Sequence, residues 1–207
     1  MKIKSRSIGF TFLMSLFVYV ALVIFIVPPV HTSELLDIVR ENRAELEKSM
    51  PGIQVLSISY NSEYSPSKLS NIVWICFKNQ HLFTGFDKSV STIFHVSSCA
   101  TGKNPGQKQK EGDMRTPEGN FTVQQIQDAS WWKPYTDSQT GDTTGYGPYF
   151  IRIKTPGWRG IGIHGTDDDH LDEIGTNASH GCIRLKNDSL IQVKNMAEVG
   201  QQIIILQ

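Results

Sequence analysis

Short hydrophobic runs, several with an apolar residue at every second position, recur along the chain after residue 52. They are bounded by Gly, Asn, Ser and Pro, and such alternation is typical of β-strands, whose side chains point to opposite faces in turn. Many short strands favour a mainly β domain, either a sandwich or a partly closed barrel. The expected strands span residues 53–60, 71–78, 81–86, 91–97, 120–126, 149–154, 161–164 and 202–206.

Two segments have a helical pattern instead. Residues 33–50 carry leucine, isoleucine and valine among alternating charges and end at Pro51-Gly52, which predicts a helical spacer. Such a helix would pack on the side of the domain or hold the domain away from a membrane. A second helix is expected near the C-terminus, with Asn187 or Asp188 as its N-cap and Gly200 at its end.

The first 30 residues have the composition of a membrane-spanning segment. Lys2, Lys4 and Arg6 precede an uncharged run from Ser7 to Val30, and ~20 helical residues are enough to cross the ~30 Å hydrocarbon layer of a bilayer. The positive flank favours an orientation that places the rest of the chain outside the cytoplasm. We expect a retained anchor, with a cleaved signal peptide as the alternative. The organisation is then an anchor in 1–30, a spacer in 31–51 and one folded domain in 52–207.

The overall composition argues against a nucleic-acid-binding protein. Twenty basic and twenty acidic residues cancel to a formal net charge of zero, so no basic field is available to attract a phosphate backbone. A length of 207 residues corresponds to about one domain once the N-terminal segment is set aside, and a hydrophobic content of 39% is enough for a core. We expect no nucleic-acid partner.

The most informative stretch of the chain runs from His164 to Arg184. It contains His164-Gly165-Thr166 and then Ser179-His180-Gly181-Cys182-Ile183-Arg184. A thiol is a nucleophile in its thiolate form, which a neighbouring imidazole or positive charge favours. The glycine before Cys182 lets the backbone turn sharply, so that the sulfur and successive main-chain N–H groups can face one point and hold an oxyanion. The pattern predicts an activated-cysteine site.

Zinc binding is an alternative for the same stretch, because histidine, cysteine and aspartate are zinc ligands. The sequence contains no compact pair of the Cys-x-x-Cys or His-Glu-x-x-His type. We therefore expect neither a metal nor another cofactor. The acidic run from Asp167 to Glu173 is interpreted as a solvated loop.

The remaining cysteines, Cys76 and Cys99, both lie in or next to expected strands. In an exported chain they would form a disulfide between neighbouring strands. Alternatively, they stay unpaired and buried as small apolar groups. The residues alone leave both alternatives open.

Two long polar segments interrupt the strand pattern. Residues 101–115 are rich in Gly, Lys, Gln and Asn and are expected to be a mobile hairpin connection. Residues 127–148 include Trp131-Trp132 and several glycines, and long loops in compact domains are often lids or binding loops. We expect this loop to cover the active site, with Trp131 packed in the core.

With these residues in place, the chain resembles the YkuD-type L,D-transpeptidases, exported bacterial enzymes that join peptidoglycan stem peptides through a cysteine. The family pattern is a histidine followed, after an interval that is 14 residues here, by Ser/Thr-His-Gly-Cys. Residues 115–121, Arg-Thr-Pro-Glu-Gly-Asn-Phe, match the Thr-Pro-x-Gly-x-Phe block of these domains, and residues 161–166 match the strand that delivers the first histidine. The resemblance spans roughly residues 53–206.

The resemblance implies a YkuD-like fold and a role for each residue of the motif. Cys182 would be the nucleophile and His164 the base that takes the thiol proton, with an imidazole oriented by the backbone carbonyl of Gly165. His180 and Gly181 would line the site, and the N–H groups of Gly181 and Cys182 would form an oxyanion hole. The implied substrate contacts are Ser179 and Arg184, of which Arg184 would bind a substrate carboxylate and stabilise the thiolate. Trp132, from the long loop, is a further expected substrate contact.

The resemblance also implies the reaction and its location. Cys182 would attack the bond between the third and fourth residues of a peptidoglycan stem, and an amine from a second stem would resolve the thioester. An L,D-carboxypeptidase or endopeptidase using the same cysteine, or a non-catalytic wall-binding module, is the alternative. The expected partners are stem peptides and, through residues 1–30, the cytoplasmic membrane, with the catalytic domain facing the periplasm or cell wall.

Overall fold

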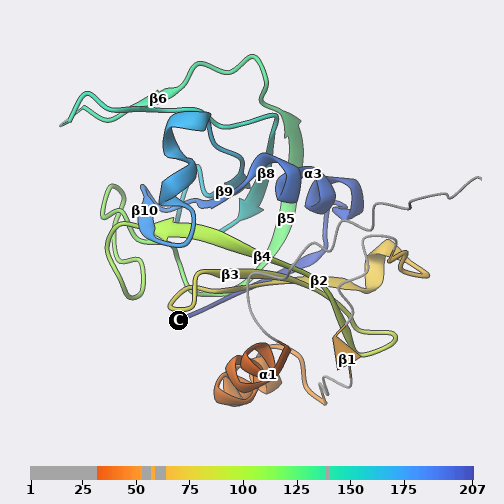
Figure 1. The fold of residues 1–207 in the computed structure, drawn as a ribbon. Coiled ribbons are helices and arrows are strands. Elements are labelled where there is room, and N and C mark those ends of the chain that lie inside the picture. Colours follow the sequence, from red (N-terminus) through yellow and green to blue (C-terminus); the bar gives the residue numbers. More distant parts are fainter. Residues whose placement is uncertain (1–31, 53–56, 59–63, 139) are drawn as a thin grey trace, which may run out of the picture.

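The computed structural model describes residues 32–207 except 53–56, 59–63 and 139. Its main feature is a sheet that closes on itself into a barrel-like ring (Figure 1). The ring is built from β2 (Ile72–Phe77), β3 (Leu82–Asp87), β4 (Thr92–Gly102), β5 (Gly119–Asp128), β8 (Tyr149–Lys154), β9 (Gly162–His164), β11 (Ile183–Leu185) and β12 (Gln202–Leu206). Their hydrogen-bonded order is β4-β11-β9-β8-β5-β12-β2-β3, and β3 pairs back with β4.

Four short strands lie outside the ring. Strands β1 (Ser57–Ile58) and β10 (Asn177–Ser179) each pair in parallel with β4. Strands β6 (Tyr135–Thr136) and β7 (Thr143–Thr144) form a separate antiparallel pair, which projects away from the barrel in Figure 1.

The prediction of a mainly β domain is confirmed, and the sheet is a closed ring rather than a sandwich. Closure removes the exposed sheet edges that an open arrangement would leave. Every ring strand except β11 overlaps a strand expected from the alternation of apolar residues. The unexpected strands β6, β7, β10 and β11 contain two or three residues each, too few to show a period. The expected strand over 53–60 lies mostly outside the described residues.

Strands β2 and β12 are apolar at nearly every position because both of their faces are covered. In β12, Ile203 and Ile205 belong to the core inside the ring, whereas Ile204 and Leu206 belong to a second apolar cluster outside it. The same division holds in β2, where Trp74 faces the inner core. A continuous apolar strand therefore requires a further element against its outer face.

That outer element is the segment over residues 33–50, which forms two helices, α1 (Thr32–Glu41) and α2 (Arg43–Ser49). Leu35, Ile38 and Leu46 are buried in the outer cluster together with residues of β2 and β12. In Figure 1, α1 lies below the sheet on the side opposite the β6–β7 pair. The spacer thus packs on the side of the barrel.

The expected C-terminal helix is present as α3 (Asn187–Met196), which buries Leu190 and Val193 in the inner core and ends at Met196 rather than at Gly200. Its N-cap is Lys186, so the expectation that Asn187 or Asp188 caps the helix is wrong. The Oδ1 of Asn187 instead accepts the N–H of Thr166 at 3.1 Å. The start of α3 therefore holds the segment that follows His164.

Cys76 and Cys99 meet inside the ring as free thiols. Their Sγ atoms lie 4.0 Å apart, about twice the S–S bond length of ~2.05 Å. Of the two alternatives, the structure has the buried unpaired cysteines, which fill the core as small apolar groups.

The expected anchor in residues 1–30 lies outside the described residues. Among the helices that the structure does describe, none is long and apolar enough to cross a membrane.

Candidate active site

The parallel pairing of β9 with β11 brings the two halves of the cysteine motif together. Ile163 pairs with Ile183, and both side chains are buried in the inner core. Because side chains alternate along a strand, the next pair in register, His164 and Arg184, faces the opposite side of the sheet. Cys182 lies two positions before Arg184 and therefore faces that side as well. The cysteine, the histidine and the arginine share one face although they come from separate strands.

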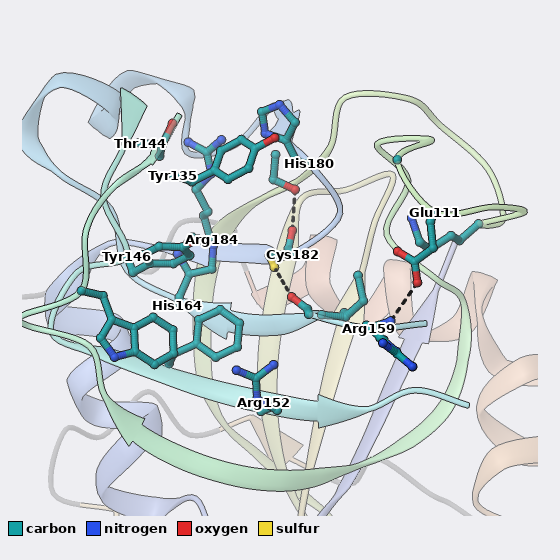
Figure 2. Close-up of a pocket in the computed structure, with 17 residues that line it drawn as sticks. Glu111, Tyr135, Thr144, Tyr146, Arg152, Arg159, His164, His180, Cys182 and Arg184 are labelled. Atoms are coloured by element: carbon teal, nitrogen blue, oxygen red, sulfur yellow. Dashed lines mark hydrogen bonds between the residues drawn. The ribbon is translucent and has the colours of Figure 1, made fainter. Parts of the chain in front are cut away.

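These residues line a cavity of about 260 Å³, shown in Figure 2. The predicted site residues His164, Ser179, His180, Cys182, Arg184 and Trp132 are all in its wall. The alternation rule adds Phe150 and Arg152 from β8, since Phe150 pairs with His164 and Arg152 pairs with Gly162. Further wall residues that the sequence did not single out are Lys108, Glu111, Tyr135, Thr144, Tyr146 and Arg159.

The thiol of Cys182 lies in the wall of the cavity as a protonated group. Its Sγ is 3.3 Å from the carbonyl oxygen of Gly160, to which the S–H donates. Burial raises the pKa of the Cys182 thiol, against the opposing effects of the Gly162 N–H and of the positive charges on Arg184, Arg152 and Lys108. Burial outweighs these charges, so the resting thiol is neutral.

His164 is fixed as a neutral imidazole. Its Nδ1 lies 2.7 Å from the carbonyl oxygen of Gly165, which can only accept, so the proton is on Nδ1 and Nε2 keeps a free lone pair. The ring stacks on Phe150 at 5.6 Å between centroids and meets the Tyr146 ring at 5.2 Å. Burial and, secondarily, the charge of Arg184 lower the pKa of His164 to about 3.

Gly165 is required by the space at its position. A Cβ at position 165 would lie 2.0 Å from Asn187 Oδ1. The backbone N–H of Gly165 donates to the carbonyl of Tyr146 at 2.9 Å. The expected orientation of an imidazole by the Gly165 carbonyl is present in the structure.

The turn before the cysteine depends on Gly181, whose φ of 127° is unfavourable for residues with a side chain. The Gly181 N–H donates to Ser179 Oγ at 3.0 Å, and Ser179 Oγ–H donates to the carbonyl of Cys182 at 2.6 Å. The Ser179 hydroxyl thus stabilises the turn by bonding to the backbone of both Gly181 and Cys182. Since the Gly181 N–H is engaged by Ser179, the Cys182 N–H is left as the candidate oxyanion donor.

Arg184 is buried, and both of its terminal nitrogens bind other residues of the protein. One terminal nitrogen lies 2.5 Å from Glu173 Oε2, and the other donates to the carbonyl of Ala178 at 3.0 Å. Its side chain is 4% exposed, so the expected contact with a substrate carboxylate is not supported. Its charge still acts on Cys182 and His164.

His180 is held by the loop over residues 129–148. Its Nε2 lies 2.7 Å from Oδ2 of the buried Asp137, and its ring packs on Tyr135 at 4.8 Å. Lys103 lies 3.8 Å from the same carboxylate oxygen. Asp137 and Tyr135 had no signal in the sequence beyond their presence in a long loop.

The two tryptophans of this loop have opposite environments. Trp132 packs on Tyr146 and Phe150, each at 5.4 Å between ring centroids. Trp131 is 77% exposed, so the expectation that Trp131 packs in the core is wrong. Of the two tryptophans, Trp132 is the one that lies in the cavity wall.

The acidic run after Thr166 is a short helix rather than a loop, although Asp168, Asp169 and Asp172 are exposed to solvent as expected. Residues Asp168–Glu173 form the 3-10 helix η2. His170 lies 2.5 Å from Asp167 Oδ1 through Nδ1 and 3.5 Å from Asp142 Oδ1 through Nε2. Asp167 also accepts the N–H of Gly145. These contacts tie the 129–148 loop to η2. Within the described part of the chain, no group of three or more potential metal ligands converges.

Comparison with known proteins gives a consistent result. A family model of the L,D-transpeptidase catalytic domain, YkuD, matches residues 70–205. YqjB of Bacillus subtilis (strain 168), which is named as an L,D-transpeptidase, is 30% identical over 112 residues, 53% of this chain and 58% of that protein.

Solved structures share the fold. L,D-transpeptidase 3 from Mycobacterium tuberculosis, in complex with a faropenem-derived adduct, is 21% identical with a TM-score of 0.51, over 66% of this chain and 60% of that one. The LD transpeptidase LdtMt1 in complex with imipenem is 20% identical with a TM-score of 0.50, over 66% and 59%. The chain spans about three fifths of the length of the relatives it matches.

We expect the alkylation of Cys182 by iodoacetamide to accelerate with pH throughout the range from pH 6 to about pH 9, because burial holds the thiol pKa above its ordinary value of 9.0 and the thiolate is the reactive form. Mass spectrometry of the alkylated protein measures the rate. Cys182→Ala should lose the reaction, since Cys76 and Cys99 are buried. A rate that is already flat between pH 6 and 7 would show a preformed thiolate and contradict this expectation.

Proposed function

The chain belongs to the YkuD family of L,D-transpeptidase catalytic domains, and we propose that it is a peptidoglycan-modifying cysteine acyltransferase. The observation that carries the proposal is the presence of Cys182 and His164 in one cavity, with the His164 Nδ1 proton committed to Gly165. A neutral imidazole with a free Nε2 is the form needed to accept a thiol proton.

In the first half of the proposed reaction, His164 Nε2 takes the thiol proton as Cys182 Sγ attacks the carbonyl carbon between the third and fourth residues of a donor stem. Negative charge collects on the carbonyl oxygen, where the Cys182 N–H is the candidate donor. The peptide bond then breaks, and the proton on His164 passes to the departing amine. The products are a thioester on Cys182 and a free D-amino acid.

In the second half, an amine from a second stem attacks the thioester and gives up a proton through His164. The new amide forms as the C–S bond breaks, and the thiol recovers its proton. Water in place of the amine would make the enzyme a carboxypeptidase or endopeptidase with the same cysteine. The intact cysteine and histidine argue against a non-catalytic wall-binding module.

In the resting site Cys182 and His164 are both neutral. This state is suited to a mechanism in which substrate binding triggers the proton transfer between them. The pKa of Cys182 is raised and that of His164 is lowered, both mainly by burial, so proton transfer becomes favourable only as the developing oxyanion is stabilised. Arg184 supports the thiolate through its charge while it stays paired with Glu173.

The 129–148 loop is proposed to act as a lid that favours the amine over water. Trp132 packs on the two aromatic residues that also enclose the His164 ring, Tyr146 and Phe150. Removing water from the thioester slows hydrolysis more than aminolysis when the amine is held by other contacts.

We also propose that residues 1–30 anchor the protein and that the barrel faces the periplasm or cell wall. The proposal is supported by the basic flank and the uncharged run up to Val30. The full chain should fractionate with membranes, and a chain starting at His31 should not. A mature protein that begins after residue 30 in the soluble extracytoplasmic fraction would instead establish a cleaved signal peptide.

Incubation with a tetrapeptide stem should add the mass of the tripeptide acyl group to the protein and release the fourth residue. Cys182→Ala should abolish this adduct, because no other described thiol is exposed to the cavity. Cys99→Ala, a change of a buried thiol, should retain it. Intact-protein mass spectrometry measures both, and an adduct that persists in Cys182→Ala would refute the cysteine mechanism.

Trp132→Ala should raise the ratio of hydrolysis to transfer, because it opens the aromatic wall beside His164. Trp131→Ala is the matched control: the same side chain is removed from a position that is 77% exposed, and the ratio should stay as in the unmodified protein. Chromatographic separation of trimmed monomers from cross-linked dimers gives the ratio. Equal ratios in both variants would count against the lid.

A further inference from the structure

The cavity around Cys182 has an excess of positive charge. Four cationic side chains and one carboxylate, Glu111, line it. Lys108 is neutralised by Asp113, 2.7 Å away, and Arg184 is neutralised by Glu173. The cations that remain are Arg159, exposed at the rim, and Arg152, which is half-buried.

Arg152 is placed beside the nucleophile by strand register. It pairs with Gly162 across β8 and β9, and the Gly162 N–H is close enough to Cys182 to lower the pKa of its thiol. The residue between Arg152 and Cys182 is therefore a glycine, with no side chain to separate the guanidinium from the thiol. Figure 2 shows Arg152 directed into the same space as Cys182.

The guanidinium of Arg152 is oriented by the protein, but its terminal nitrogens have no protein partner among the described residues. Its Nε–H donates to Gln127 Oε1 at 3.2 Å, and its Cζ lies 5.1 Å from the centroid of the Phe150 ring. In the described part of the chain no carboxylate pairs with it and its terminal nitrogens have no acceptor. Such a pre-oriented fork is suited to a bidentate contact with a carboxylate.

We propose that Arg152 binds the α-carboxylate of the residue that leaves the acyl donor, and so selects donors that end in a free acid. This inference rests on the proposed function. The leaving residue is attached to the carbonyl under attack, and one residue spans at most ~3.6 Å. Its carboxylate must therefore lie near the sulfur, inside the cavity, where Arg152 is the half-buried cation without a partner.

Arg152 also lowers the pKa of Cys182 through its charge, so its loss should slow acylation by any donor. Two donors separate this general effect from recognition: a tetrapeptide with a free C-terminal carboxylate, and the same peptide with a C-terminal carboxamide. The effect of the Arg152 charge on Cys182 is the same for both donors, whereas a contact between Arg152 and a carboxylate is possible only with the free-acid donor. The ratio of their kcat/KM values measures recognition alone.

The unmodified full chain should prefer the free acid, and Arg152→Gln should reduce that preference by about 10- to 100-fold, the range expected for a hydrogen-bonded charge pair. Arg152→Lys should keep part of the preference, because it retains the charge without the fork. Lys154→Gln is the matched control: it removes one charge from an exposed position on the same strand, outside the cavity, and the preference should be unchanged.

An equal preference in the unmodified chain and in folded Arg152→Gln, with circular dichroism as the check on folding, would overturn the proposal. If Arg152→Gln does not fold, the same comparison is decided by Arg152→Lys, whose unchanged preference would overturn it. If neither donor acylates the unmodified chain, the proposed function fails instead. Calorimetric titration with the two intact peptides then tests recognition separately: tighter binding of the free acid supports it, and equal affinities overturn it.

Discussion

The register between β9 and β11 is the constraint on which the site depends. Ile163 and Ile183 are both buried inside the ring, and the gain from burying a large aliphatic side chain is about 2 kcal/mol each. A slip of one residue would turn these isoleucines outward and the catalytic face inward. Packing of the core therefore fixes His164 and Cys182 on a common outer face, so the geometry of the site depends on hydrophobic burial on the other side of the same strands.

Burial also sets the charge state of the site. The aromatic rings of Phe150 and Tyr146 enclose His164, and desolvation lowers its pKa while it raises that of Cys182. Arg184 works in two directions, because its charge stabilises a thiolate and opposes an imidazolium. The Gly165 carbonyl partly offsets the second effect by accepting the Nδ1 proton. The result is a pair in which both Cys182 and His164 are neutral at rest.

The sequence predicted the features that local patterns encode, namely strands and the cysteine motif. It did not predict contacts between residues that are distant in the sequence and meet only in the closed barrel. Alternating apolar residues revealed most ring strands, and the motif revealed Cys182 and His164. Strand β11 is three residues long, so the Cys182 segment showed no periodicity of its own. Asp137 and Tyr135 reach His180 from a distant loop, and no local signal marks them. Trp131 and Trp132 are adjacent and identical, and only the position of Phe150 decides which one packs.

Two of the three arginines of the cavity, Arg184 and Arg152, show why proximity in sequence is a poor guide to binding. Arg184 lies two residues after the nucleophile, yet η2 supplies Glu173 as its partner and leaves its side chain 4% exposed. A buried charge without a counterion is costly. The carboxylate of Glu173 is the counterion of Arg184, and the fixed charge of Arg184 acts on Cys182 and His164. Arg152 is half-buried and close enough to water to remain charged without a counterion. Because they differ in burial, the two residues have different roles: Arg184 stabilises the site, and Arg152 is available to bind a ligand.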